Sequence, residues 1–313
     1  MSGARLLGVA AERPARVVTN DELSVRLDTS DEWIRTRSGI ANRRFAADTD
    51  TVESLAVGAG AKALATAGVA PGDVDLVIVA TASMPTSVPG AAAVVATGVG
   101  AAGAGALDVN AGCAGFCYAL GMAADAVRAR SAQRVLVVGS ERMTDLTDPD
   151  DRATAVLFGD GAGAAVVGAT RSNEIGPTVW GSDGTGASLL RVPAETGFLE
   201  MDGRAVYRWA TTQLAASARE AIERADLHPR DLRAFVAHQA NLRIINALAD
   251  GLGLDDTCIV ADDVVDSGNT SSASVPMALA RLIDEGRVSS GDPVLLFAFG
   301  AGLTWAGQVV YVP

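Results

Sequence analysis

The sequence has few cysteines, few histidines and few aromatic residues, and the cysteine shortage excludes one class of protein. Three cysteines among 313 residues cannot form the disulfide framework of a small secreted domain. The opening segment MSGARLLGVA has too short an apolar run for a signal peptide. The sequence therefore predicts a cytoplasmic protein.

Positive charge is also in deficit. The chain has 25 lysines and arginines against 37 aspartates and glutamates, which gives a net charge of −12. Such a chain repels nucleic acids and anionic membrane surfaces, so neither is expected as a partner. Arginines nevertheless gather in residues 35–44 and 204–243, where a local basic patch for an anionic ligand is compatible with an acidic total.

One long stretch, residues 81–107, lacks charge altogether. It is long enough to imitate a membrane span, but it contains Pro85, Pro89 and several glycines, and its apolar residues are mostly Ala and Val. We therefore expect a buried loop and helix here, and not a bilayer helix.

Short β-branched runs alternate with alanine-rich segments of helical length, which is the pattern of an α/β fold with buried sheets. The 49% of hydrophobic residues is enough for a large core. The expected strands are residues 75–81, 134–140, 162–168, 232–238 and 293–299. The expected helices are residues 52–67, 114–130, 204–225, 241–251 and 271–285.

Two parts of the chain repeat one order of elements. Residues 68–80 (GVAPGDVDLVIVA) and 226–238 (DLHPRDLRAFVAH) both place a Pro-x-Asp turn before an apolar strand, and a later helix then leads into a second strand. This repetition predicts two halves related by a pseudo-two-fold axis, residues 1–170 and 171–313, with a site where they meet.

Cys113 is the expected nucleophile. It follows an expected strand that ends in Ala-Gly, and a long amphipathic helix begins just after it. The free N–H groups and dipole of a helix N-terminus favour a thiolate, and the small neighbours leave room for a substrate carbonyl. Cys117, one turn later, is expected only to pack, and the pair has no further ligands for a metal.

Polar residues elsewhere in the chain are candidate catalytic partners of Cys113. Of the two histidines, His228 lies in a proline turn, whereas His238 ends an expected strand, which is the usual position of an α/β active site. Asn269 follows Gly268 just before an expected helix. It is a candidate partner of Cys113, but the same residues would also occur in a loop that only caps the helix. The glycine-rich FGDGAGA, residues 158–164, runs into a strand and not a helix, which argues against NAD binding.

Taken together, GCAGF, HQANLRI, GNTSSAS and FGAGLTW resemble the β-ketoacyl-acyl carrier protein synthase III family, which has the thiolase fold. TSDEWIRTRSGI and FGDGAGA are similar to the same family, and the motifs follow its order along nearly the whole chain. The resemblance implies an α/β thiolase-like fold with two pseudo-two-fold-related halves, buried mixed sheets, and helices between and outside them. The composition, low in lysine and rich in Ala, Arg and Gly, is similar to that of actinomycete members.

The resemblance also implies an activity. An acyl-CoA starter would acylate Cys113, and malonyl-acyl carrier protein would then lose carbon dioxide and condense with the acyl group, which initiates fatty-acid synthesis. His238 and Asn269 would complete a triad and stabilise the enolate, while the backbone N–H groups of Cys113 and Ala301 would face the oxyanion. No metal or other cofactor is expected.

Further roles follow from the resemblance alone. The positions that match coenzyme A ligands are Trp33, Arg37, Arg152 and Asn241. The positions that match carrier-protein contacts are Arg208 and Arg243. A homodimer is implied as well, in which a residue near Val88 closes the acyl pocket of the partner chain.

Two departures from the family pattern bear on these expectations. Where the family commonly has three glycines, the chain has Gly300-Ala301-Gly302, and a positive φ at Ala301 would cost about 1–2 kcal/mol. The segment 186–202 is shorter than in many relatives and is expected near the acyl pocket.

Three alternative functions remain in view. A priming enzyme of a polyketide pathway shares every motif. A thioesterase-like hydrolase would not need His238 and Asn269 arranged for an enolate, and a non-catalytic partner subunit would be expected to have lost Cys113.

Overall fold

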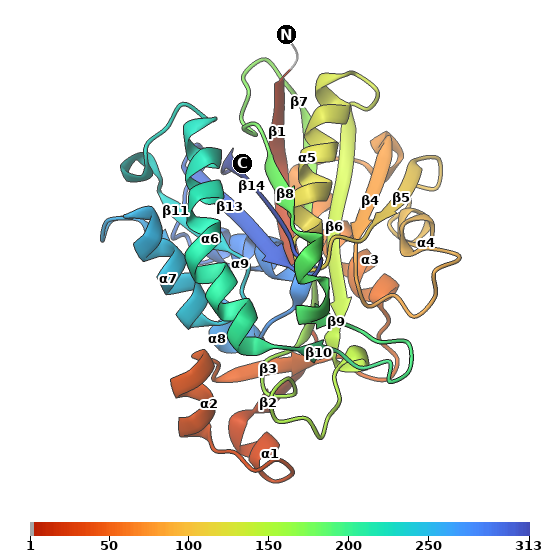
Figure 1. Ribbon diagram of the computed structural model, residues 1–313. Helices are drawn as coiled ribbons and strands as arrows, with labels where there is room; N and C mark the ends of the chain where they lie inside the picture. Colours follow the sequence, from red (N-terminus) through yellow and green to blue (C-terminus); the bar gives the residue numbers. More distant parts are fainter. Residues whose placement is uncertain (1–2) are drawn as a thin grey trace.

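The computed structural model describes residues 3–313, which form two five-stranded mixed sheets (Figure 1). In order across the first sheet, the strands are β1 (Gly3–Glu12), β7 (Asp160–Thr170), β6 (Arg134–Arg142), β4 (Leu76–Ala80) and β5 (Gly105–Val109). Across the second, they are β8 (Val179–Ser182), β14 (Thr304–Tyr311), β13 (Pro293–Gly300), β11 (Ala234–Ala237) and β12 (Ile259–Val260).

The two sheets have the same pairing pattern. In the first, β7 pairs antiparallel with β1 and β6, and β4 pairs parallel with β6 and β5. In the second, β14 pairs antiparallel with β8 and β13, and β11 pairs parallel with β13 and β12. The repeated Pro-x-Asp segments become matching 3-10 turns, Pro71–Asp73 and Pro229–Asp231, before β4 and β11. The structure thus confirms two similar halves, while the boundary at 170/171 stays a prediction.

Helices lie between the sheets and on both outer faces, as predicted. Helices α5 (Gly115–Arg128) and α9 (Ser274–Asp284) contact strands of both sheets. Helices α3 (Val52–Ala67) and α4 (Ala91–Gly98) cover the outer face of the first sheet. Helices α6 (Gly203–Glu223) and α7 (Leu242–Leu252) cover that of the second, on the left in Figure 1.

Local sequence explains where these helices begin and end. The Thr51 hydroxyl caps α3 in a capping box with Ser54, and Gly68 ends the helix in the left-handed region at φ 63°. Helix α5 carries no charge in its first turn, and its Ala, Gly, Phe and Leu side chains are buried on most sides. Such a helix belongs between two sheets, where every face is covered.

A small unit lies at the lower end of Figure 1, away from both termini. It consists of β2 (Arg16–Thr19), α1 (Asn20–Ser24), α2 (Asp31–Ser38) and β3 (Asn42–Phe45). Arg43 fastens it to the body by donating to the carbonyl oxygens of Val18 and Val156 and to Asn20 Oδ1. The predicted basic patch is therefore wrong for Arg43, which is completely buried.

The remaining elements are short. They are the 3-10 turns Met143–Leu146, Gly184–Leu189 and Ser271–Ala273, the strands β9 (Leu190–Arg191) and β10 (Glu200–Met201), and α8 (Val264–Ser267). The predicted helix 271–285 is thus split into a 3-10 turn followed by α9, with Ser271 at φ 49°.

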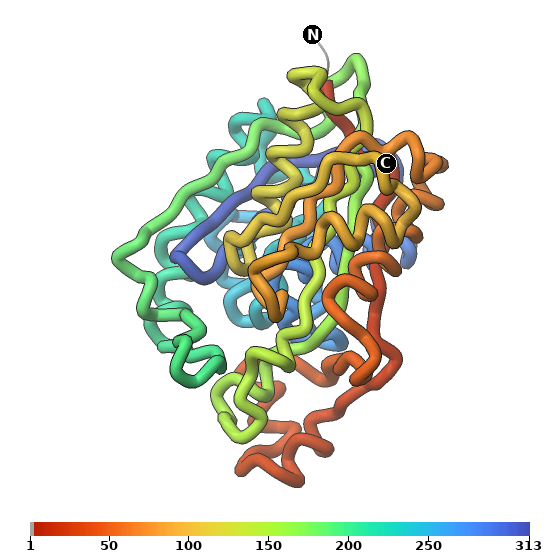
Figure 2. The backbone as a smooth tube through the Cα atoms, turned by 90° about the vertical axis from the view of Figure 1, so that its right-hand side faces the viewer, coloured from red at the N-terminus to blue at the C-terminus, as the bar shows by residue number. Residues whose placement is uncertain are grey.

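The charge-free stretch forms a loop, α4 and β5, and crosses the face shown in Figure 2, in orange and yellow. The single chain does not bury this loop, because residues 85–89 are exposed and Val88 has 85% of its surface accessible. Over residues 3–313, no helix has the length and apolar character that a membrane crossing requires.

Candidate active site

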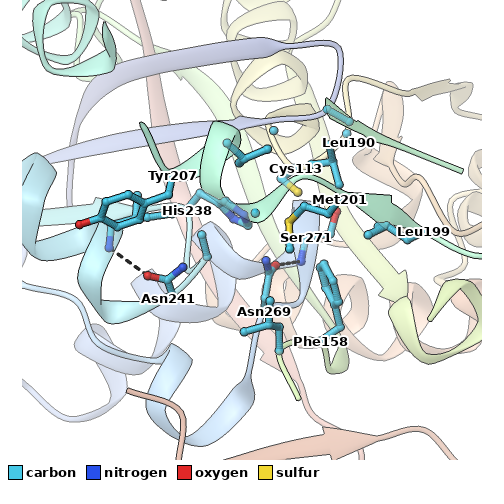
Figure 3. Close-up of a pocket in the computed structure, with 18 of the residues that line it drawn as sticks. Cys113, Phe158, Leu190, Leu199, Met201, Tyr207, His238, Asn241, Asn269 and Ser271 are labelled. Atoms are coloured by element: carbon cyan, nitrogen blue, oxygen red, sulfur yellow. Dashed lines mark hydrogen bonds between the residues drawn. The ribbon is translucent and has the colours of Figure 1, made fainter. Parts of the chain in front are cut away.

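The fold brings the three predicted catalytic residues to one cavity of about 1400 Å³. Cys113 lies just before α5, separated from it by Ala114, and Asn269 precedes the turn that leads into α9, so the residues that precede both central helices line this space. His238 follows the carboxyl end of β11. Figure 3 shows these three side chains directed into the same space from three different elements.

Cys113 is packed closely from both sides. A Cβ on Gly300 would lie 2.8 Å from the Cys113 Cβ, so only glycine fits there. Gly112, at φ 52°, makes the turn that directs the Cys113 sulfur into the cavity. Cys113 itself is only 8% exposed.

The expectation of a thiolate at Cys113 is wrong for the free protein. Burial raises the pKa of the Cys113 thiol to about 12, although hydrogen bonding from Ser271 and from its own backbone N–H acts in the other direction. Helix α5 starts only at Gly115. Desolvation outweighs these hydrogen bonds, the Glu141 carboxyl raises the pKa further, and no cationic side chain is among the causes of the shift.

His238 is a neutral imidazole with one defined tautomer. It is 2% exposed, and burial lowers its pKa to about 3. Its Nδ1 lies 2.7 Å from the Ser274 hydroxyl, which already accepts the backbone N–H of Gln239. Among the hydrogen bonds of residues 3–313, Nδ1 is the only acceptor for the Ser274 hydroxyl, which assigns the Ser274 proton to Nδ1 and the imidazole proton to Nε2, from which it can be donated to a ligand. Phe299 packs edge-to-face against the ring at 5.3 Å.

Asn269 presents a second donor. Its Oδ1 accepts the backbone N–H of Ser271 at 2.9 Å, which leaves the Nδ2 hydrogens for the cavity. Backbone hydrogen bonds with Leu157 and Gly159 fix the residue, and Gly268 before it has φ 67°. His238 and Asn269 together therefore offer two neutral N–H donors near the sulfur of Cys113.

Two backbone N–H groups near the sulfur have no carbonyl acceptor. In the backbone hydrogen bonds described for residues 3–313, neither the N–H of Cys113 nor that of Ala301 donates to a carbonyl oxygen, and the N–H of Cys113 faces its own sulfur. Ala301 does not have a positive φ, whereas Gly302 does, at 133°. The backbone cost considered for alanine at position 301 therefore does not arise.

The expected coenzyme A positions line the outer part of the same cavity. Two arginines contact Trp33: the guanidinium carbons of Arg37 and Arg152 lie 4.8 and 5.0 Å from the centre of its ring. A flat aromatic flanked by cations can stack a heterocycle and bind phosphates. Asn241 lines the cavity too, and it also caps α7, a role that the sequence analysis missed.

The expected carrier-protein positions lie at the same cavity. Arg208 and Arg243 both line it, and Arg243 stacks on Tyr207 at 5.0 Å. Residues 186–202 lie near it as predicted, since Leu190, Val192 and neighbours contribute to its wall. Val88 does not line the cavity of its own chain.

Sequence reasoning missed Ser271, Ser274 and Glu141. The serine run in GNTSSAS marked the region, but it was assigned only to capping. Ser274 reaches His238 across 36 positions of the chain, and Glu141 contacts Ser272 across 131. Such contacts depend on the packing of the halves and have no local signal.

Two family models match the chain. Residues 107–184 match 3-oxoacyl-[acyl-carrier-protein] synthase III, and residues 222–312 match its C-terminal model. The chain is 50% identical to β-ketoacyl-[acyl-carrier-protein] synthase III 2 of Streptomyces avermitilis, over the whole of both chains. It is 51% identical to synthase III 4 of Streptomyces coelicolor over 99% of each. The chain belongs to the β-ketoacyl-acyl carrier protein synthase III family.

Solved structures agree with this assignment. The chain is similar to the priming β-ketosynthase of the R1128 polyketide biosynthetic pathway, with a TM-score of 0.97 and 47% identity over 99% of this chain and 96% of that one. It is also similar to 3-oxoacyl-[acyl-carrier-protein] synthase III of Aquifex aeolicus, with a TM-score of 0.95 and 38% identity over 99% and 100%. The predicted family, fold and enzyme class are confirmed: the protein is a condensing acyltransferase with the thiolase fold.

Proposed function

We propose that this synthase III joins an acyl-CoA starter to malonyl-acyl carrier protein through an acyl thioester on Cys113. One observation carries the proposal. The buried sulfur shares its cavity with two neutral N–H donors, His238 Nε2 and Asn269 Nδ2. A hydrolase would need a base for water, whereas two donors suit an enolate oxygen.

In the loading step the Cys113 sulfur attacks the thioester carbon of acyl-CoA. The carbonyl oxygen becomes an oxyanion, for which the N–H groups of Cys113 and Ala301 are available. The bond between the acyl carbon and the coenzyme A sulfur breaks, and the thiol proton leaves with coenzyme A.

In the condensation step the malonyl group loses carbon dioxide, and the electron pair of the broken C–C bond forms an enolate. The Nε2–H of His238 and the Nδ2–H of Asn269 donate to its oxygen. The enolate carbon then attacks the acyl carbon, the thioester bond to Cys113 breaks, and the thiolate takes up a proton. The product is a β-ketoacyl thioester on the carrier protein.

The two thioester substrates would enter by the same mouth. In this proposal Trp33 stacks the adenine, Arg37 and Arg152 bind phosphates, and Asn241 lines the pantetheine path. The acidic carrier protein would dock on Arg208 and Arg243, which lie on a chain whose net charge is −12.

We also propose that two copies of the chain form a symmetric dimer. Strand β5 is the end strand of the first sheet, so one of its edges is unpaired in the single chain. Val88 and Val94 nearby are 85% and 47% exposed, within a stretch that has no charge. An unpaired apolar edge of this kind favours pairing with a second copy.

The acyl-enzyme is the direct test of the main proposal. Intact-mass spectrometry after exposure to a panel of acyl-CoAs should show one added acyl group on the Cys113 peptide. His238→Ala and Asn269→Ala should still load but should fail to condense with malonyl-acyl carrier protein. Labelling at Cys117 or Cys258, or normal condensation by both variants, would contradict the proposal.

A second pair of measurements tests the dimer. In the proposed assembly Val88 closes the partner's acyl pocket, so Val88→Phe should shift acyl-CoA preference toward acetyl without disturbing the dimer. Sedimentation should give the mass of two chains. A stable and active monomer would refute the dimer, and an unchanged preference would refute only the shared pocket.

Starter synthesis for a polyketide pathway is the second candidate function. The 47% identity to a priming β-ketosynthase favours it, and its chemistry at Cys113 is the same. The acyl panel separates the two, because fatty-acid initiation and polyketide priming differ in the starter or in the carrier protein that supplies the acceptor.

A further inference from the structure

The two N–H groups assigned to the oxyanion belong to different halves of the chain. Cys113 lies in the first half, between β5 and α5, whereas Ala301 lies in the second, in the tight turn between β13 and β14. Two such donors stabilise an oxyanion only when both lie within hydrogen-bonding distance of the same oxygen. The fold must therefore fix the position of Ala301 relative to Cys113.

Close backbone contact provides part of this constraint. A Cβ on Gly112 would lie 3.2 Å from the backbone nitrogen of Ala301, and a Cβ on Gly300 would lie 2.9 Å from that of Cys113. The two glycines thus allow the segments to approach each other. Such contact sets a lower limit to the separation of the segments, and a directional bond between them can set the upper limit.

Thr304, the first residue of β14, makes a bond of this kind. Its hydroxyl oxygen lies 2.9 Å from the carbonyl oxygen of Ala111 and 2.8 Å from that of Ala301. A carbonyl can only accept and a threonine hydroxyl has one proton, so the two carbonyls share that proton. In the described part of the chain, no other hydrogen bond joins residues 110–114 to residues 300–304.

Both carbonyls lie next to the oxyanion donors along the backbone. The carbonyl of Ala301 is on the same residue as the donor N–H. The carbonyl of Ala111 is separated from the N–H of Cys113 only by Gly112. The Thr304 hydroxyl therefore acts one peptide group away from each donor.

We propose that the hydroxyl of Thr304 sets the separation of the two oxyanion donors, by joining the segment before Cys113 to the turn that carries Ala301. Thr304 is thus a positioning residue, since its one proton is shared by two backbone carbonyls. The inference rests on the proposed function, because it concerns the oxyanion of the loading step.

The role predicts which half-reaction depends on Thr304. The oxyanion forms when the Cys113 sulfur attacks acyl-CoA, whereas His238 and Asn269 donate to the enolate. Loss of the Thr304 hydroxyl should therefore slow acyl loading and spare decarboxylation. This is the reverse of the result expected for His238→Ala and Asn269→Ala.

Thr304→Val is the main variant. It replaces the hydroxyl with a methyl group of similar volume, which cannot donate and cannot remain 2.8 Å from a carbonyl oxygen. The single-turnover loading rate should fall at least tenfold, since loss of one oxyanion donor costs about 100- to 1000-fold in rate. Thr304→Ala removes the hydroxyl without this close contact and should be slow as well. Thr304→Ser keeps the hydroxyl and should load within about threefold of wild type.

Thr211 in α6 is the matched control. It is half-buried like Thr304, and its hydroxyl oxygen lies 2.9 and 3.3 Å from the carbonyl oxygens of Tyr207 and Arg208. Both carbonyls belong to α6, so this hydroxyl joins no separate segments. Thr211→Val should load acyl groups at the wild-type rate.

Two readouts separate positioning from general damage. Oxyanion donors act in the transition state, so Thr304→Val should lower the maximal loading rate while the acyl-CoA concentration for half-maximal rate stays constant. The rate is followed by intact mass in quenched samples. After loading has gone to completion, one turnover with malonyl-acyl carrier protein should release carbon dioxide within about threefold of the wild-type rate, because His238 and Asn269 are unchanged.

Each outcome decides one question. Loading by Thr304→Val within threefold of wild type overturns the positioning role, and so does a tenfold loss that Thr304→Ser or Thr211→Val shares. A crystal structure of Thr304→Val in which Ala301 keeps its place against Ala111 overturns the link without reference to activity. A wild type that forms no acyl-enzyme with any acyl-CoA refutes the proposed function instead, and the crystal structure still tests the link.

Discussion

The resting state of Cys113 can be tested by its alkylation rate. Burial raises the pKa of this thiol from 9.0 to about 12. At pH 8 the thiolate fraction falls from about one tenth to about one in ten thousand, because each pH unit below the pKa is a factor of ten. Alkylation by iodoacetamide should therefore be about a thousandfold slower than for an unshifted thiol.

The shape of the pH profile matters more than the absolute rate. From pH 6 to pH 9.5 the alkylation rate of Cys113 should rise tenfold per unit with no plateau. His238 cannot supply a counter-charge in this range, since burial lowers its pKa to about 3. Removing the imidazole with His238→Ala should leave the slope unchanged.

The assay needs a single reactive thiol. Cys117 and Cys258 are buried too, so a Cys117→Ala, Cys258→Ala background read by intact mass isolates Cys113. A plateau below pH 8 that disappears in His238→Ala would reveal a thiolate–imidazolium pair and refute the neutral pair inferred from burial.

Three further perturbations have defined outcomes. Ser274→Ala removes the hydroxyl that orients His238. Condensation should fall at least tenfold while acyl loading persists. The free energy of unfolding, measured in urea, should fall by about 1–3 kcal/mol. Arg43→Met leaves three buried acceptors unpaired and should lower the free energy of unfolding by about 3–5 kcal/mol. Reversing Arg208 and Arg243 to Glu should raise KM for malonyl-acyl carrier protein far more than for acyl-CoA, in steady-state assays, and the wild-type rate with carrier protein should fall with salt. Equal effects of the reversal on both substrates would place these arginines elsewhere.

The elements that the sequence predicted best are those with strong local signals. The helix over residues 52–67 was predicted with its true limits, because its capping threonine and terminal glycine are explicit in the sequence. The strand–turn–helix around Cys113 also formed as expected. Local signals cannot report burial, however, and two errors follow from that. Arg43 was grouped with other arginines in a basic patch, and a thiolate was expected at Cys113, where burial raises the pKa of the thiol.

The site residues divide in the same way. Cys113, His238, Asn269 and Ala301 stand in motifs and were predicted, and the structure places them around one cavity. The partners that orient them are serines and a glutamate in ordinary surroundings. Their role depends on which strands lie side by side, and that is decided by the pairing of two halves far apart in the chain.

The duplicated fold explains how two half-reactions share one cavity. Equivalent helices α5 and α9 begin at the same space, but one follows the nucleophile Cys113 and the other follows the donor Asn269. Equivalent strands β4 and β11 end there as well, one before His238 and the other before the loop that binds Glu141. In the proposed mechanism the first half thus forms the covalent bond and the second supplies the enolate donors. Glu141 links the two halves, because it lies in β6 of the first and accepts the N–H and the hydroxyl of Ser272 in the second.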